Sequence, residues 1–190
     1  MNRKLLPLIT ALLILASGFY LDNFTDQKVL GVDDIRNLLT APKEEAVVSP
    51  DQITVVRVVD GDTIIINNKG VQEKVRLIGI DTPESKDPRK KVECFANAAT
   101  KKAEDLLLNK PITLEPDPTQ QERDRYGRLL RYVFLPGNIL VNELLIKEGF
   151  AYEYTYSTSY KYQERFIEAE QEAQRNKSGL WADSTCRGER

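Results

Sequence analysis

The hydrophobic pattern at the start of residues 51–190 has the period of β-strands. Three β-branched runs stand close together, at 53–59, 63–67 and 72–80. Turn-forming residues separate the runs, namely Asp60-Gly61 and Asn68-Lys69-Gly70, and these residues favour tight hairpins. The pattern therefore predicts a three-stranded meander.

Arg76 lies within the third of these runs, between the apolar residues Val75 and Leu77. Successive side chains of a strand point to opposite faces, so Arg76 is predicted to share its face with Ile78 and Ile80. We therefore expect this arginine to be held on one face of a barrel rather than in a loose loop.

Three later segments show the period of helices. The first has its apolar positions between 95 and 107 and stops at Asn109-Lys110-Pro111. The second is short, covers 141–148 and is closed by Gly149, a residue that commonly ends helices. The third ends near Ser178-Gly179, with Trp181 beyond it as a packing anchor, and its apolar face carries Tyr162, Phe166, Ala169 and Ala173.

Two further strands are predicted, at 112–115 and 128–135. Five short strands with a helix inserted after the third indicate a small closed β barrel of the OB type, with helices packed around it. The expected fold class is α+β, mainly β: a five-stranded OB barrel with three packed helices. At 190 residues the chain has room for one such domain, placed at 51–190, plus an extension.

The extension at 1–50 has two parts. Arg3 and Lys4 precede an uncharged apolar run from Leu5 to Leu21, which is typical of an export signal. The run is long enough, at about 17 residues, that a retained membrane anchor fits as well as a cleaved signal peptide. Residues 22–50 are acidic and are interpreted as a flexible linker. We expect the domain to be extracellular or anchored to the outer face of the cytoplasmic membrane, where residues 1–21 would contact the lipid.

Composition restricts the chemistry that the domain can use. The formal net charge is -2, so nucleic-acid binding requires a local site rather than a general positive field. The chain has no histidine, which excludes imidazole as a general base or zinc ligand. Cys94 and Cys186 are the two cysteines. In an oxidising compartment such a pair tends to form a disulfide, and the alternative is two thiols too far apart to bond.

Four polar clusters at strand ends carry the candidate chemistry: Val59-Asp60-Gly61-Asp62-Thr63, Arg76-Leu77, Asp81-Thr82-Pro83-Glu84 and Asp124-Arg125-Tyr126-Gly127-Arg128. Each cluster alone has a structural explanation, as a hairpin turn, a surface ion pair or a helix start. Those explanations do not account for carboxylates and two guanidinium groups recurring together in a chain without histidine.

In the order and spacing of all four clusters, residues 51–181 resemble the staphylococcal nuclease (thermonuclease) family. The resemblance implies an OB barrel with three helices. It also implies a calcium-dependent phosphodiesterase that acts on DNA and RNA and leaves 3′-phosphate ends.

The resemblance assigns a role to each site residue. Asp62 and Asp81 would supply carboxylates to Ca²⁺ and Thr82 its backbone carbonyl, which are the oxygen ligands that calcium prefers. Asp60 would orient these ligands from behind, and Glu84 would hold the attacking water as general base. Arg76 and Arg128 would bind the scissile phosphate, because a planar guanidinium reaches two oxygens at once.

The tyrosine assignments follow the same resemblance. Tyr126, Tyr154 and Tyr156 would offer ring faces for bases to stack on. The segment 151–160 is one residue shorter than the family pattern and contains four tyrosines, so a surface loop with some rings packed inward is an equal alternative. The chain is also near neutral, whereas the best-known member of the family is strongly basic.

Two other functions compete with a nuclease. The first is a non-catalytic OB module that only binds nucleic acid or a protein partner, but degenerate copies of that kind lose the acids and arginines present here. The second is a polysaccharide-binding module with a structural calcium, which leaves both arginines unexplained. We expect a monomer whose substrates are single-stranded or loosened DNA and RNA.

Overall fold

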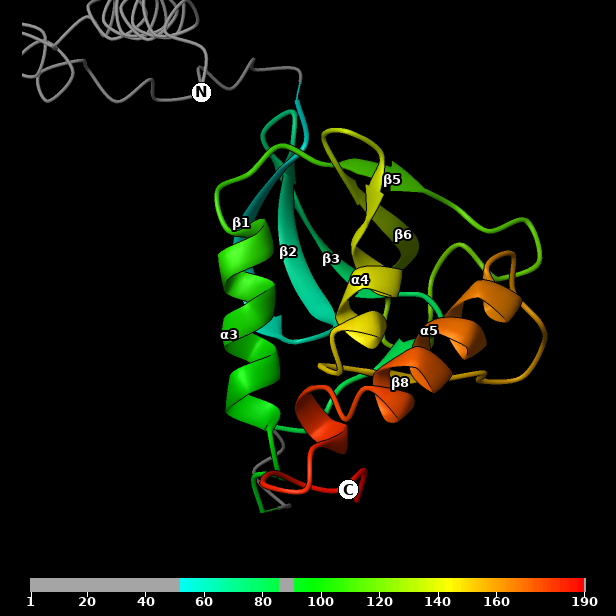
Figure 1. Ribbon diagram of the computed structural model, residues 1–190. Coiled ribbons are helices and arrows are strands. Elements are labelled where there is room, and N and C mark those ends of the chain that lie inside the picture. Colours follow the sequence, from blue (N-terminus) through cyan, green and yellow to red (C-terminus); the bar gives the residue numbers. More distant parts are fainter. Residues whose placement is uncertain (1–51, 86–90, 190) are drawn as a thin grey trace, which may run out of the picture. The chain divides into compact units, whose positions relative to one another are not determined.

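The computed structural model describes residues 52–85 and 91–189, all within one unit of the chain, Val47–Arg190 (Figure 1). The signal peptide or anchor predicted at 1–21 and the linker predicted at 22–50 lie outside the described residues. Across 52–85 and 91–189, no helix combines the length and the hydrophobicity needed to cross a membrane.

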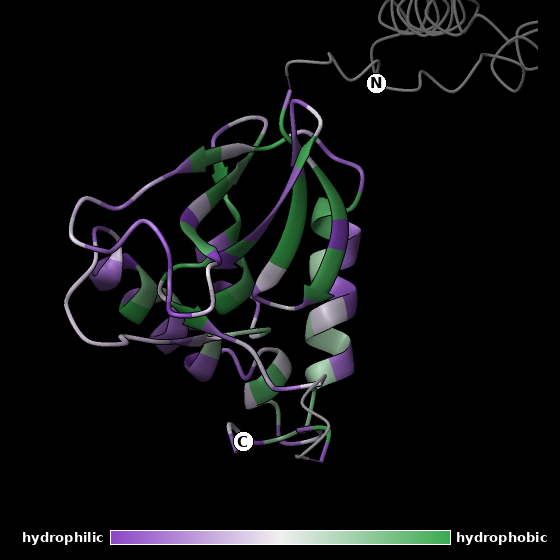
Figure 2. Ribbon diagram, turned by 180° about the vertical axis from the view of Figure 1, so that it is seen from behind, coloured by the Kyte–Doolittle hydropathy of each residue, from purple (hydrophilic) through white to green (hydrophobic). Residues whose placement is uncertain are grey.

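The predicted meander is confirmed. Strands β1 (Thr54–Asp60), β2 (Thr63–Asn68) and β3 (Val71–Leu77) pair antiparallel in chain order. Ile64 and Ile66 of β2 are fully buried, and Figure 2 shows hydrophobic residues along these strands. The alternation of apolar and polar residues therefore reflects a sheet with one face in the core.

The predicted third strand ends earlier than its sequence pattern suggested. β3 stops at Leu77, and Gly79 turns the chain with a φ of 75°. A Cβ on Gly79 would come within 2.6 Å of the Tyr160 ring, so this turn requires glycine. Ile80–Asp81 instead forms a separate strand, β4, which pairs with β8 (Tyr152–Glu153). The expectation that Arg76 shares one strand face with Ile78 and Ile80 was therefore wrong.

The sheet continues through a parallel pairing that no local pattern indicated. β6 (Leu129–Leu135) lies parallel to β3, with Arg76 opposite Leu130. β5 (Thr113–Glu115) pairs antiparallel with β6, and β7 (Ile139–Leu140) pairs with the end of β6. The strand order is β1-β2-β3-β6-β5.

The two edges of this sheet are joined by hydrogen bonds between β1 and the segment that leads into β5. Asn109 N–H donates to the Val55 carbonyl at 2.8 Å, and Ile112 N–H donates to the Ile53 carbonyl at 2.9 Å. These bonds close the sheet into a barrel. The predicted five-stranded OB barrel is confirmed. Closure is favourable because it pairs the backbone groups that an open sheet edge would leave exposed.

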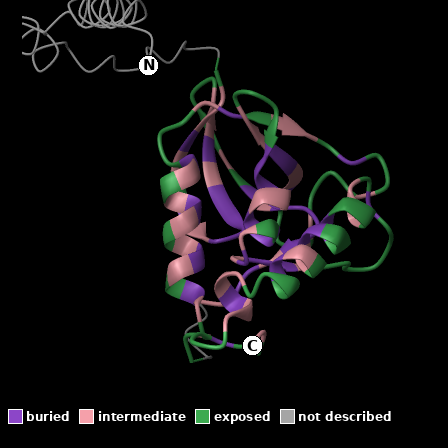
Figure 3. Ribbon diagram, in the orientation of Figure 1, coloured by how far each residue is buried: buried purple, intermediate pink, exposed green. Residues whose placement is uncertain are grey.

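Among the described residues, three α-helices pack around the barrel as predicted: α3 (Ala96–Leu107), α4 (Val141–Lys147) and α5 (Gln163–Arg175). A short 3-10 turn, η1 (Gly179–Trp181), follows α5. α3 lies beside β1 and β2 in Figure 1. The buried residues of each helix recur at helical spacing and so form a stripe, and Figure 3 shows buried and exposed residues side by side on the helices. On α3 the stripe consists of Ala96, Ala99, Ala103 and Leu107, the spacing expected of an amphipathic helix.

A buried side chain, Asn142 at the start of α4, fixes the bend that follows β3. Its Oδ1 accepts the Val133 N–H at 3.0 Å, and its Nδ2 donates to the Ile78 carbonyl at 2.8 Å. Asn142 is fully buried, where an unpaired amide would be costly. The bond to Ile78 therefore holds the turn from β3 to β4, which carries Arg76 at one end and Asp81 at the other.

A second buried polar group, Asp117, connects the loop after β5 to the rest of the domain. Its Oδ2 accepts the Lys161 N–H at 2.8 Å and the Tyr132 hydroxyl at 2.5 Å, while Oδ1 accepts the Thr119 N–H at 2.8 Å. Burial acts to raise the pKa of the Asp117 carboxyl, but the hydrogen bonds from Lys161, Tyr132 and Thr119 outweigh it and hold the pKa below the ordinary 3.8.

We predict that Asp117→Asn lowers the free energy of unfolding by about 1–3 kcal/mol near neutral pH, because an amide nitrogen cannot accept both the Lys161 and the Tyr132 donors. The stabilisation from the ionised carboxylate is present above the unfolded-state pKa and is lost as the pH falls through the lower folded-state pKa. The difference between the two proteins should therefore narrow below about pH 4. Urea unfolding at several pH values measures it, and a difference that does not vary with pH would contradict the assignment.

Candidate active site

The candidate site is organised around the carboxylate of Asp62, at the turn between β1 and β2. Asp62 Oδ2 accepts the Thr82 N–H at 2.8 Å and the Thr82 hydroxyl at 3.1 Å, and Oδ1 accepts the Thr63 hydroxyl at 3.0 Å. Asp62 and Thr82 are both buried. A Cβ on Gly61 would lie within 2.7 Å of the Thr82 side chain, so glycine permits the close approach of the two segments.

Arg76 joins this carboxylate to that of Asp81. Its Nη2 donates to Asp81 Oδ1 at 3.0 Å, and its Nη1 forms an ion pair with Asp62. Nη1 is buried and forms no hydrogen bond of normal geometry, so Nη1 interacts with the Asp62 carboxylate as an ion pair. Burial lowers the pKa of the Arg76 guanidinium, an effect that Asp81 opposes. The strands set this arrangement, because Arg76 lies opposite Thr63 in the β2–β3 register.

Arg128 reaches the same region from the start of β6. Asp124 holds it, accepting the Arg128 N–H at 3.0 Å on Oδ1 and the Nε–H at 2.5 Å on Oδ2. Its Nη1 donates to the Thr63 hydroxyl at 3.4 Å. Arg128 also acts to lower the pKa of Arg76. Two guanidinium groups that repel each other in this way are suited to binding an anion.

Asp60 and Glu84 complete the polar cluster. Asp60 Oδ1 accepts the Asp62 N–H at 3.3 Å. Burial raises the pKa of the Asp60 carboxyl, the negative charge of Glu84 adds to the rise, and Thr63, Arg76 and Arg128 oppose it. Glu84 and both arginines therefore lie within electrostatic reach of Asp60. Glu84 follows β4 in a loop and is half-buried.

The tyrosines of 151–160 divide into two kinds. Tyr152 and Tyr160 are buried at 5% and 6% exposure, whereas Tyr154 and Tyr156 are 39% and 72% exposed. The two exposed rings lie 6.3 Å apart. Tyr126 is 68% exposed and lies under the guanidinium groups of Arg125 and Arg128, at 4.8 Å and 5.4 Å from its ring centre. The three tyrosines predicted to contact substrate are thus the exposed ones.

Comparison with known proteins then identifies the family. The family model described as "Staphylococcal nuclease homologue" matches residues 74–183, a span that runs from β3 through η1 and contains both arginines. The chain belongs to the staphylococcal nuclease family. Asp60 and Asp62 lie before the matched span, and the β2–β3 pairing brings their turn to it.

The chain is similar to several curated proteins of this family. It is 44% identical to a thermonuclease of Staphylococcus hyicus over 129 residues, which cover 68% of this chain and 75% of that protein. It is 40% identical to a thermonuclease of Staphylococcus intermedius over 139 residues, 73% of this chain and 81% of that protein. It is 39% identical to the endonuclease YncB of Bacillus subtilis (strain 168) over 133 residues, 70% of this chain and 62% of that protein.

The predicted metal ligands Asp62, Asp81 and Thr82 are linked to one another by direct or shared contacts. Asp62 and Asp81 share Arg76, and Thr82 hydrogen-bonds to Asp62. Within 52–85 and 91–189, no three His, Cys, Asp or Glu side chains are grouped as metal ligands. The carboxylates of Asp62 and Asp81 and the Thr82 carbonyl are nevertheless all oxygen donors, the kind that a hard cation such as Ca²⁺ prefers.

Two residues with a clear role were given none by the sequence analysis. Thr63 bridges Asp62 and Arg128 through its hydroxyl, and Asp124 anchors Arg128 by the side chain and the backbone. Asp124 stands four residues before Arg128, with a turn at Gly127 (φ 77°) between them. That spacing was the available signal for Asp124. The contact of Thr63 with Arg128 joins the first residue of β2 to the residue just before β6 and has no local signal.

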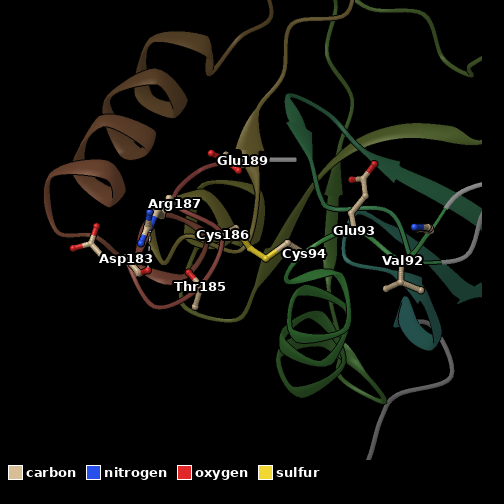
Figure 4. Close-up of a pocket in the computed structure, with 9 residues that line it drawn as sticks. Val92, Glu93, Cys94, Asp183, Thr185, Cys186, Arg187 and Glu189 are labelled. Carbon is tan, nitrogen blue, oxygen red and sulfur yellow. Dashed lines mark hydrogen bonds between the residues drawn. A yellow bond between two sulfur atoms is a disulfide. The ribbon is translucent and has the colours of Figure 1, made fainter.

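Cys94 and Cys186 form a disulfide, with their Cα atoms 5.9 Å apart and a sequence separation of 92. Figure 4 shows the bond joining the segment before α3 to the C-terminal segment. Both cysteines line a surface pocket of about 590 Å³, together with residues of 91–93 and 183–189. This pocket contains none of the predicted catalytic or metal-binding residues.

We predict that reduction of the disulfide lowers the thermal unfolding midpoint, because a cross-link across 92 residues restricts the unfolded chain and contributes about 4 kcal/mol in the chain-entropy model. Reduction should not abolish activity, since neither cysteine lies in the proposed catalytic set. Thermal unfolding with and without a phosphine reductant, next to a Cys94→Ser/Cys186→Ser double variant that should not respond, measures the effect. Two titratable thiols in the unreduced protein would contradict it.

Proposed function

We propose that this chain is a calcium-dependent nuclease that hydrolyses phosphodiester bonds of DNA and RNA and leaves 3′-phosphate ends. Membership of the staphylococcal nuclease family makes it a hydrolase of phosphodiester bonds, and its relatives carry the names thermonuclease and endonuclease. The observation that carries the proposal is the gathering of Arg76 and Arg128 with the acids Asp60, Asp62, Asp81 and Glu84.

The two arginines are suited to hold the scissile phosphate. Each is fixed by a carboxylate, Arg76 by Asp62 and Asp81 and Arg128 by Asp124. Their mutual repulsion would be relieved when an anionic phosphodiester group lies between them. Positive charge that is already in place stabilises the negative charge that grows on the phosphoryl oxygens in the transition state, without reorganisation at that moment.

Glu84 is the candidate general base. A water oxygen would attack phosphorus while its proton passes to the Glu84 carboxylate, and the bond from phosphorus to the 5′-oxygen of the leaving nucleotide would break. The phosphate then stays on the 3′-oxygen, and the 5′-oxygen leaves as a hydroxyl once it gains a proton. A base of this kind typically contributes about 10² to 10⁴ in rate.

Ca²⁺ would be held by the carboxylates of Asp62 and Asp81 and by the Thr82 carbonyl, with Asp60 orienting them through the Asp62 backbone. When bound, the cation neutralises charge on the phosphate and orders water near it. Calcium accepts an irregular oxygen shell of this kind, whereas magnesium requires near-ideal octahedral geometry. Arg76 contacts both carboxylates, so in this scheme it would lie beside the cation and the phosphate that the cation binds.

The exposed rings of Tyr126, Tyr154 and Tyr156 would bind the nucleotide on either side of the phosphate. Stacking on an aromatic ring needs an unpaired base and tolerates any sequence, so single-stranded or loosened DNA and RNA are the proposed substrates. All of these residues come from one chain, and the proposal requires no second copy.

We also propose that the domain acts outside the cytoplasm, either secreted or held at the outer face of the cytoplasmic membrane by residues 1–21. Two features support this location. The Cys94–Cys186 disulfide is of a kind that persists in oxidising compartments, and the run Leu5 to Leu21 follows two cations in the manner of an export signal.

We predict that Ca²⁺ supports cleavage of single-stranded DNA and that Mg²⁺ supports it poorly, by a factor of at least about ten, because the proposed ligand set is irregular. Initial rates with each metal, and with a chelator as the blank, measure the ratio. Equal rates with the two cations would show that Asp62 and Asp81 serve a different ion.

We predict that Glu84→Gln lowers kcat by roughly 10² to 10⁴, the range typical of a lost general base, with little change in nucleotide affinity. The amide keeps the shape of the side chain and removes the proton acceptor. Single-turnover cleavage and equilibrium binding of a short oligonucleotide separate the two effects. Glu164→Gln, an exposed position on α5, is the matched control and should behave as the unmutated protein.

Arg128→Lys is the companion variant in the same assays. Lysine keeps the charge but loses the planar fork, so kcat should fall more than substrate binding weakens. Arg165 pairs with Glu143 between two helices, and Arg165→Lys is the control for the change of residue type. A protein that binds the oligonucleotide in calcium and leaves it intact would be a binding module, and the nuclease proposal would be wrong.

A further inference from the structure

The backbone of Glu84 is held by one residue that the catalytic scheme does not include. Glu84 N–H donates to the Glu93 carboxylate, at 2.9 Å from Oε2, and Glu93 N–H donates back to the Glu84 carbonyl at 3.0 Å. Both polar groups of the Glu84 peptide are thereby paired with the same residue. Glu84 belongs to no strand or helix, so no sheet ladder or helical turn supplies these partners.

Glu93 is itself attached to rigid parts of the domain. Its carbonyl accepts the Ala96 N–H at 3.2 Å, at the first residue of α3. The next residue, Cys94, is bonded to Cys186, and Figure 4 shows Glu93 beside this cross-link. Ala96 is also buried. Its hydrogen bond to the Glu93 carbonyl and the disulfide at Cys94 therefore both anchor the backbone at Glu93. The carboxylate of Glu93 therefore provides a fixed acceptor for a loop residue.

Glu84 is fixed from its other side by the site already described. Two residues earlier, Thr82 donates its N–H to Asp62 at 2.8 Å. Asp62 and Glu93 are separate carboxylates at opposite ends of the short segment 82–84, one reached from the β1–β2 turn and the other from the approach to α3. The position of a general base has to be held to within a fraction of an ångström, since small displacements cost large factors in rate.

We propose that Glu93 is a positioning residue for Glu84: its carboxylate holds the Glu84 backbone so that the Glu84 side chain is presented to the attacking water. This inference rests on the proposed nuclease function. Glu93 does not touch substrate in this scheme. It acts through a hydrogen bond, so the length of its side chain and its acceptor oxygen matter, and its charge does not.

Two conservative variants of the full chain separate these properties. Glu93→Gln keeps the reach and one acceptor oxygen but loses the charge, whereas Glu93→Asp keeps the charge and withdraws the carboxylate by one methylene. Glu104→Asp makes the same change on α3 at a half-buried position and is the matched control. Thermal unfolding of each variant shows that it is folded.

Glu93→Asp is expected to lower kcat about 10- to 100-fold, the usual effect of removing a supporting hydrogen bond behind a site, with KM for an oligonucleotide little changed. The exchange rate of the Glu84 amide hydrogen, followed by NMR, should rise about tenfold as that hydrogen loses its acceptor. Glu93→Gln should stay close to the unmutated protein in both measurements, and so should Glu104→Asp.

Three results would overturn the positioning role alone: unchanged exchange at Glu84 in Glu93→Asp, raised exchange with normal kcat, or a Gln variant as impaired as the Asp variant. The last of these would make the charge of Glu93 the important property. Failure of the unmutated chain to cleave DNA in calcium would overturn the nuclease proposal and the positioning role with it, so the two failures are distinguishable.

Discussion

The arrangement of the site depends on one interaction, the placement of the Arg76 guanidinium between the carboxylates of Asp62 and Asp81. These two acids come from different turns and would repel each other without a cation between them. Arg76 supplies that charge from a strand in the middle of the sheet, where its backbone is fixed on both sides by β2 and β6. Burial lowers the pKa of the Arg76 guanidinium, and the charges of Asp81 and Asp60 oppose that effect without cancelling it.

The rest of the fold serves to bring three turns to this strand. The β1–β2 hairpin carries Asp62, the bend after β3 carries Asp81, and the parallel pairing of β3 with β6 brings Arg128. Buried polar contacts make each turn rigid, including the amide of Asn142 on Ile78 and the carboxylate of Asp124 on Arg128. A closed barrel suits this role because its strands have few ways to shift against one another.

The loop that carries Glu84 is the exception, because it lies outside the barrel ladder and depends on side-chain contacts. Its supports are Asp62 on one side and Glu93 on the other. Glu93 stands next to the Cys94–Cys186 bond. The cross-link that restricts the C-terminal segment therefore also restricts Glu93, which supports the loop that carries Glu84. In the proposed scheme, stability and catalysis both depend on the segment that leads into α3, and the cysteines themselves take no part in the chemistry.

The sequence by itself determined the meander, the three helices and the acids and arginines of the site, because periodicity, turn residues and short motifs are local properties of a chain. The tertiary structure alone decided the β4–β8 pairing that ended β3 at Leu77, and which tyrosines of 151–160 face solvent. It also decided the contacts of Thr63 with Arg128 and of Glu93 with Glu84. These depend on packing between segments far apart in sequence, for which the amino-acid pattern of either segment carries no signal.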